Sequence, residues 1–133
     1  MDGSITSYKA LNAALELAQK IGSEVNVLHV MENVPKLYIE SQKLLEQLLA
    51  ARTDEGKKIL DKCILEAKNN GVTIKTELQE GDPASVILEL SKRDRYDTIV
   101  IGTRGLGRFK GLILGSVSSK VVHHSACSIL LVR

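Results

Sequence analysis

The sequence predicts an α/β fold built on a parallel β-sheet, because strand-like and helix-like segments alternate along the chain. At 133 residues, with 44% hydrophobic and 26% charged residues, the chain has the size and composition of one globular domain covering residues 1–133. It contains no internal repeat, no low-complexity segment and no composition typical of a linker. We therefore expect one domain with one hydrophobic core.

Four short segments have the composition of strands. Residues 72–78 alternate between the two faces of a strand, whereas Thr98–Ile101 form a continuous apolar run, which is typical of a strand buried on both faces. In chain order, the predicted strands are residues 25–30, 72–78, 98–101 and 128–132.

Four helical segments alternate with these strands. The first begins after Ser4, a good N-cap, and stops at Gly22. The third begins after Asp82, and Pro83 occupies its first position. A loop around Pro35 precedes the second helix. The predicted helices cover about residues 4–20, 39–69, 83–93 and 116–124.

The start of the chain does not fit this alternation. It opens on a helix-capping turn, Met1-Asp2-Gly3-Ser4, with no strand in front of the first helix. In an alternating α/β fold a strand normally feeds each helix. We therefore expect that the sequence starts inside a longer one, or that the strand comes from elsewhere, and that the sheet has a gap.

Composition excludes several classes of function. A net charge of +2 indicates neither a nucleic-acid partner nor an anionic membrane, and three Tyr, one Phe and no Trp argue against base-stacking surfaces. No apolar run approaches the roughly 20 residues that cross a bilayer, and no signal peptide is evident. Cys63 and Cys127 lack metal-type spacing, so we expect reduced thiols and a cytoplasmic protein.

The most informative segment is TIVIGTRGLGRFKGLILGSVSSKVV, residues 98–122. Gly102, Gly105 and Gly115-Ser116 follow an apolar strand and lead into a helix. Glycines let backbone amides approach a ligand closely, and a helix N-terminus offers unpaired N–H groups with a favourable dipole. With Ser116 interpreted as the N-cap, the spacing predicts a phosphate site. Positive charge comes from Arg104, Arg108 and Lys110, of which Arg104 is best placed to reach a phosphate.

These residues also have other interpretations. The glycines could form an ordinary strand-to-helix connection. A P-loop would need a lysine where Ser116 stands, and a dinucleotide fingerprint would lie in the first strand–helix unit. His123 and Cys127 are four apart but have no second pair of ligands, so zinc is disfavoured. Asp82 is interpreted as a cap and His29 as a hydrogen-bonded core histidine.

In these motifs the chain resembles the ATP-binding branch of the universal stress protein family over essentially its whole length. The matching residues are Asp2-Gly3-Ser4, Leu28-His29-Val30, Gly81-Asp82-Pro83, residues 97–102, and the spacing Gly102-x2-Gly105-x9-Gly115-Ser116. The resemblance implies a three-layer α/β/α, Rossmann-like open parallel sheet of five strands. The first strand, which lies in the middle of that sheet, is missing here, and Met1 would be its last residue.

The resemblance also implies a site for ATP, with ADP or AMP as possible occupants, together with Mg²⁺. In it, Asp2 would assist adenosine or metal binding and Val30 would offer its main chain to adenine. The predicted binding residues are Asp2, Val30, Gly102, Arg104, Gly105, Gly115, Ser116, Val117 and Ser118. A homodimer through the C-terminal strand, Ile129–Val132, is also implied, since apolar edges seek partners.

The predicted function is a nucleotide-dependent switch or sensor in the stress response, with little hydrolysis of its own. Phosphoryl transfer requires an oriented nucleophile and metal ligands. The sequence offers a phosphate cradle without a clear base, and no second acidic ligand beside Asp2. Two alternatives stay open: a slow metal-dependent ATPase, and a dimeric interaction scaffold in which nucleotide is structural.

Overall fold

The computed structural model describes residues 1–33, 41–107 and 114–133. The predicted loop around Pro35, the predicted helix start at Ile39, and Arg108 and Lys110 lie outside these residues. The elements are α1 (Ile5–Ile21), β1 (Val25–Met31), α2 (Gln42–Asn69), β2 (Ile74–Glu80), α3 (Pro83–Arg93), β3 (Thr98–Gly102), α4 (Ser116–His124) and β4 (Ser128–Val132). The predicted alternation is therefore confirmed.

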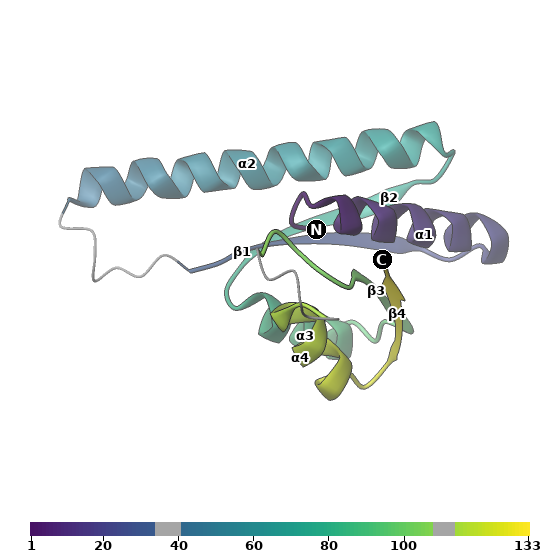
Figure 1. Ribbon diagram of the computed structural model, residues 1–133. Helices are drawn as coiled ribbons and strands as arrows, with labels where there is room; N and C mark the ends of the chain where they lie inside the picture. Colours follow the sequence, from purple (N-terminus) through teal and green to yellow (C-terminus); the bar gives the residue numbers. More distant parts are fainter. Residues whose placement is uncertain (34–40, 108–113) are drawn as a thin grey trace.

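The strands lie between two layers of helices. Strand β1 pairs with β2 and β3 pairs with β4, both in parallel. Within the described residues the two pairs are separate sheets, because β1 and β3 are not hydrogen-bonded to each other. Figure 1 shows α1 and α2 on one side of the strands and α3 and α4 on the other. The fold is thus a three-layer α/β/α arrangement with a break in the middle of its sheet.

Local signals in the sequence determine where the helices begin and end. Ser4 Oγ accepts a hydrogen bond from the Ser7 amide at 3.2 Å, and Gly22 closes α1 in a left-handed conformation with φ 70°. At α3, the Asp82 carboxylate accepts from the Ser85 amide at 3.0 Å. The predicted caps of both helices are confirmed.

Strand β2 begins and ends two residues later than the sequence predicts, at Ile74 and Glu80. The reason lies at the end of α2. The Val72 amide donates to the Ala67 carbonyl at 2.9 Å and so closes the helix instead of entering the sheet. Val72 therefore belongs to the turn that follows Asn70 and Gly71.

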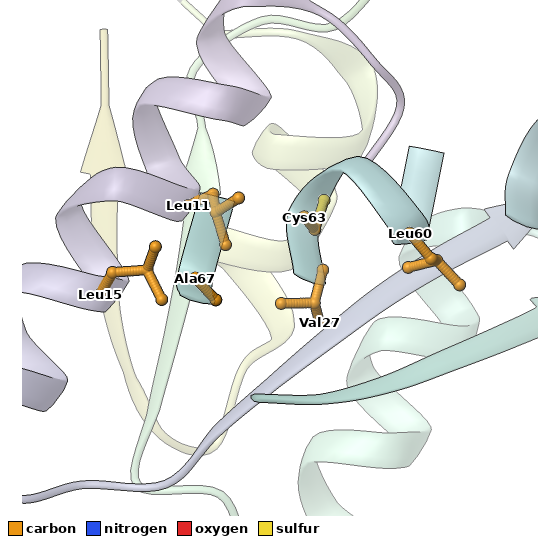
Figure 2. Close-up of a cluster of buried hydrophobic side chains, with 6 residues drawn as sticks. All are labelled: Leu11, Leu15, Val27, Leu60, Cys63 and Ala67. Atoms are coloured by element: carbon orange, nitrogen blue, oxygen red, sulfur yellow. The ribbon is translucent and has the colours of Figure 1, made fainter. Parts of the chain in front are cut away.

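The core fills the space between α1, α2 and β1. Figure 2 shows its buried members: Leu11, Leu15, Val27, Leu60, Cys63 and Ala67. Helix α2 approaches the strands closely at Gly56, where an added Cβ would lie 2.7 Å from Leu78 Cδ1 and 2.9 Å from His29 Cδ2. This contact fixes α2 against β1 and β2. Among the described helices, none combines the length and apolar character needed to cross a membrane.

Candidate functional site

One cavity of about 730 Å³ brings all the predicted binding residues together. It opens at the carboxyl ends of β1 and β3 and reaches the N-terminus of α4. The predicted residues that line it are Asp2, Val30, Gly102, Arg104, Gly105, Gly115, Ser116, Val117 and Ser118. Their grouping follows from parallel strands, whose carboxyl ends meet at one edge of an open α/β sheet. Their contact with a nucleotide stays a prediction.

Asp2 connects the first turn of the chain to the glycine loop. Its Oδ1 accepts from the Ser4 amide at 3.0 Å and its Oδ2 from the Leu106 amide at 3.2 Å. Burial alone would raise the pKa of Asp2, but hydrogen bonds from Ser4 and Ser7 outweigh it and lower the pKa from its usual value. Asp2 is therefore an ionised acceptor, with lone pairs left for a hydroxyl group or a cation.

The first two glycines of the motif have different neighbours. An added Cβ at Gly102 would lie 3.0 Å from the carbonyl carbon and oxygen of Thr6, so this glycine allows α1 to pack against the end of β3. At Gly105 an added Cβ would overlap Oδ2 of Asp2. Gly102 therefore has a packing role in the structure, whereas Gly105 makes room for the Asp2 carboxylate inside the cavity.

The N-cap of α4 is Gly115, so the prediction that Ser116 occupies this position is wrong. Gly115 has extended φ and ψ, and its carbonyl accepts the first helical bond, from the Ser119 amide at 2.9 Å. No side chain caps this helix end. Ser116, Val117 and Ser118 form the first turn of α4. Their amide N–H groups have no acceptor within the helix, and the helix dipole favours an anion at this end. The predicted helix start after the glycines is present, shifted by one residue, and phosphate binding there stays a prediction.

Thr103 and Ser118 hold the glycine loop in place. The Thr103 carbonyl accepts from the Gly115 amide at 2.7 Å and from Ser118 Oγ at 3.0 Å, and the Ser118 hydroxyl is also 3.0 Å from the Gly115 carbonyl. Both side chains are buried. Because the Ser118 proton is directed at main-chain carbonyls, its hydroxyl positions the loop, and its amide is the group that remains for a phosphate.

Arg104 is exposed at the rim of the cavity. Its main-chain carbonyl accepts a hydrogen bond from Thr6 Oγ1, which ties the loop to the first turn of α1. The contribution of Thr6 and of Thr103 was missed by sequence reasoning. Both act through contacts between segments far apart in the chain, and no local pattern indicates such contacts.

A second cavity, of about 300 Å³, adjoins the first between the N-termini of α3 and α4. It shares Ser116 and Val117 with the main cavity and is also lined by Asp82 and Lys120. Lys120 Nζ lies 3.6 Å from Asp82 Oδ1 across this space. Asp82 thus caps α3, as predicted, and also faces the only lysine among the described residues that line either cavity.

His29, interpreted as a core histidine, and His123, considered as a zinc ligand, both lie close to main-chain carbonyls. His29 Nδ1 lies 2.7 Å from the Met1 carbonyl, and burial lowers the pKa of its ring. His123 Nδ1 lies 2.7 Å from the Ser119 carbonyl. In the described part of the chain, no three His, Cys, Asp or Glu side chains gather as metal ligands. Because Asp2 and Glu32 are the acidic residues lining the main cavity, Mg²⁺ would fit here only if phosphate oxygens and water supplied most of its ligands.

Comparison with known proteins relates the whole chain to one protein family. The model of the "Universal stress protein family" matches residues 1–133. Universal stress protein YxiE of Bacillus subtilis is 34% identical over 140 residues, covering 100% of this chain and 95% of that protein. Universal stress protein UspA from Lactobacillus plantarum superposes with a TM-score of 0.91 at 24% identity, covering 100% of this chain and 93% of the other. A universal stress protein solved in complex with cAMP has a TM-score of 0.72 at 26% identity, covering 100% and 92%.

Proposed function

Because the chain belongs to the universal stress protein family, we propose that it binds an adenine nucleotide in the main cavity and acts as a nucleotide-dependent switch in the stress response. One observation carries the proposal: the uncapped N-terminus of α4 opens into the cavity that Asp2 and Val30 also line. Such a helix end binds phosphate through its amides and dipole. The ionised Asp2 carboxylate suits the hydroxyl groups of a ribose.

The proposed placement puts adenine at the main chain of Val30 and the phosphates at Ser116, Val117 and Ser118. The relative solved with cAMP supports an adenine ligand. The adjoining cavity supports ATP over a monophosphate, since it shares Ser116 and Val117 and extends toward Lys120. The terminal phosphates would occupy that extension, with Arg104 and Lys120 supplying positive charge. Mg²⁺ would be held mainly by the phosphates.

We propose binding with little hydrolysis. Hydrolysis needs a group that orients or deprotonates the attacking water. The Asp2 oxygens already accept the amides of Ser4 and Leu106. A switch also requires that bound and free states differ, and the first turn of α4, at Ser116, Val117 and Ser118, is the described segment that a phosphate would hold. The two free cysteines, one of them buried, support the cytoplasm as its compartment.

The first test is to identify what the purified protein carries. Protein prepared without added nucleotide is denatured, and released small molecules are identified by mass spectrometry. Calorimetry then measures affinity for ATP, ADP, AMP and GTP, with and without Mg²⁺. We expect adenine nucleotides to bind, with ATP tightest and GTP much weaker. A protein that releases no nucleotide and binds none of the four contradicts the proposal.

Two substitutions at Ser116 test the phosphate position. Ser116→Glu adds a negative charge in the first turn of α4, where it suits the helix dipole but repels phosphate, so ATP affinity should fall at least about tenfold with the fold retained. Ser116→Ala keeps the amide and should bind within about threefold of the parent. Equal affinities for both variants would place the phosphates elsewhere. Circular dichroism of each variant controls for folding.

A further inference from the structure

One ion pair joins α3 to α4 at the phosphate end of the site. Lys120 Nζ lies 3.6 Å from Asp82 Oδ1, and both residues line the smaller cavity together with Ser116 and Val117. Each of the two charged side chains is at least half exposed. An exposed pair at this distance is weak, so another anion can take the place of Asp82 beside the lysine.

The two members of this pair are held with different firmness. Asp82 Oδ2 accepts from the Ser85 amide at 3.0 Å and from Ser85 Oγ at 2.8 Å, and these hydrogen bonds lower the pKa of Asp82 from its usual value. The Gly81 amide donates to the Met31 carbonyl at 3.0 Å, which ties the start of α3 to the end of β1. Asp82 is therefore a fixed negative charge. Among the described residues, the long contact with Asp82 is the only ion pair that holds Lys120.

The position of Lys120 on α4 directs its side chain toward the first turn of the helix. Lys120 stands four residues after Ser116 and three after Val117, which places the three side chains on one face of the helix. Side chains of an α-helix lean toward its N-terminus, and four residues span only about 6 Å along the axis. The lysine ammonium group can therefore reach a phosphate that the amides of Ser116 and Val117 bind.

The charges around the smaller cavity give Lys120 a decisive role. Its described lining contains two acidic residues, Glu32 and Asp82, and Lys120 as the only basic one. The end of β1, which carries Glu32, is fixed to α2, because the Glu32 carbonyl accepts from Arg52 Nη1 at 2.7 Å. A terminal phosphate in this cavity would thus face two carboxylates, and Lys120 is the cation there that offsets their repulsion.

We propose that Lys120 leaves Asp82 and pairs with the terminal phosphate of a bound nucleotide, so that the contact between α3 and α4 depends on the number of phosphates. The inference rests on the proposed function and supplies its switching step. ATP breaks the ion pair, whereas AMP, whose single phosphate binds at the first turn of α4, leaves it intact. Lys120 is thereby the residue that distinguishes ATP from AMP, and Asp82 is the anion that competes with ATP for it.

Calorimetry with ATP and with AMP tests this inference on the parent and its variants. Lys120→Met should lower ATP affinity at least about tenfold and leave AMP affinity within about threefold. Asp82→Asn keeps a good helix cap but frees Lys120, so ATP affinity should rise about threefold or more. The double variant should recover part of the ATP affinity that Lys120→Met loses, because the unpaired carboxylate is gone. Lys92→Met changes an exposed lysine in the last turn of α3 and should alter neither affinity.

Reductive methylation of lysines, measured by mass spectrometry, gives a second readout. Saturating ATP should slow the methylation of Lys120 and saturating AMP should not, with Lys92 as the internal reference. The inference is overturned if Lys120→Met lowers both affinities equally or neither, if Asp82→Asn lowers ATP affinity, or if AMP protects Lys120 as well as ATP does. In each of these cases a parent that binds AMP and ATP retains the proposed function. A parent that binds neither nucleotide contradicts the proposed function and this inference with it.

Discussion

At the scale of single residues, the site depends on how little space Gly105 occupies. The Leu106 amide reaches Asp2 Oδ2 at 3.2 Å only because no Cβ stands at the preceding position. The Gly105 backbone does not have a positive φ, so an alanine there would meet no backbone strain. Its methyl group would instead displace the carboxylate. The requirement for glycine at this position therefore arises from Asp2, on the first turn of the chain.

Gly105→Ala should lower the affinity for adenine nucleotide about tenfold or more, since it removes a charge-assisted hydrogen bond and moves Asp2. Gly107→Ala is the matched control in the same loop, because an added Cβ there has no atom within 4 Å. Its affinity should stay within about threefold of the parent. Calorimetry with ATP measures both. If the two alanines have the same effect, Asp2 does not take part in binding.

At the scale of elements, α1 determines the geometry of the site's entrance. Ser4 caps it, Thr6 in its first turn bonds to the Arg104 carbonyl, and its N-terminus packs on Gly102. Loosening the start of this helix would therefore disturb both the sheet and the glycine loop. The start of α2, capped by Ser41, has no comparable contacts among the described residues and is exposed.

Ser4→Ala should reduce the free energy of unfolding by about 1 kcal/mol, because it leaves the Ser7 amide without its side-chain acceptor at a buried helix start. Ser41→Ala removes a longer bond, 3.4 Å to the Leu44 amide, at an exposed start, and should cost less than about 0.5 kcal/mol. Urea denaturation followed by circular dichroism compares the two. A larger loss for Ser41→Ala would show that α1 does not have this role.

At the scale of the whole molecule, β4 pairs with β3 through one edge and has no strand partner on its other edge in the described part of the chain. One edge of β4 bonds to β3, and Leu130 and Leu131 are more than one third exposed. An apolar edge of this kind pairs readily with another strand. These features support the predicted homodimer through Ile129–Val132, in which the sheets of two chains would meet edge to edge.

Leu130→Lys should shift the protein toward monomer in sedimentation velocity, because a charge on an outer strand opposes edge pairing. Leu65→Lys, on the exposed face of α2, should leave the dimer intact. Repeating the measurement with ATP separates two functions. A dimer that strengthens or weakens with ATP supports the switch, whereas one indifferent to ATP supports a scaffold. A parent that stays monomeric at every concentration contradicts the predicted interface.

Most of the elements could be predicted from sequence because their signals are local. A cap such as Ser4 or Asp82 bonds to an amide three residues away, and a glycine such as Gly22 ends a helix through its own φ. A gap in the sheet was also expected, and the β1–β2 and β3–β4 pairs are separate within the described residues. The predictions that moved, the start of β2 and the cap of α4, lay where two neighbouring residues could each fill the position.

The fold class, the order of the elements and the glycine turn before α4 could be predicted from the sequence, because periodicity, caps and glycine spacing act over a few residues. The tertiary structure alone decided which distant groups meet. Asp2 and Leu106 are 104 positions apart, yet they share a hydrogen bond. The packing of α1 against Gly102 likewise became visible only through the approach of Thr6. Such contacts depend on the packing of helices against strands, which no short stretch of sequence encodes.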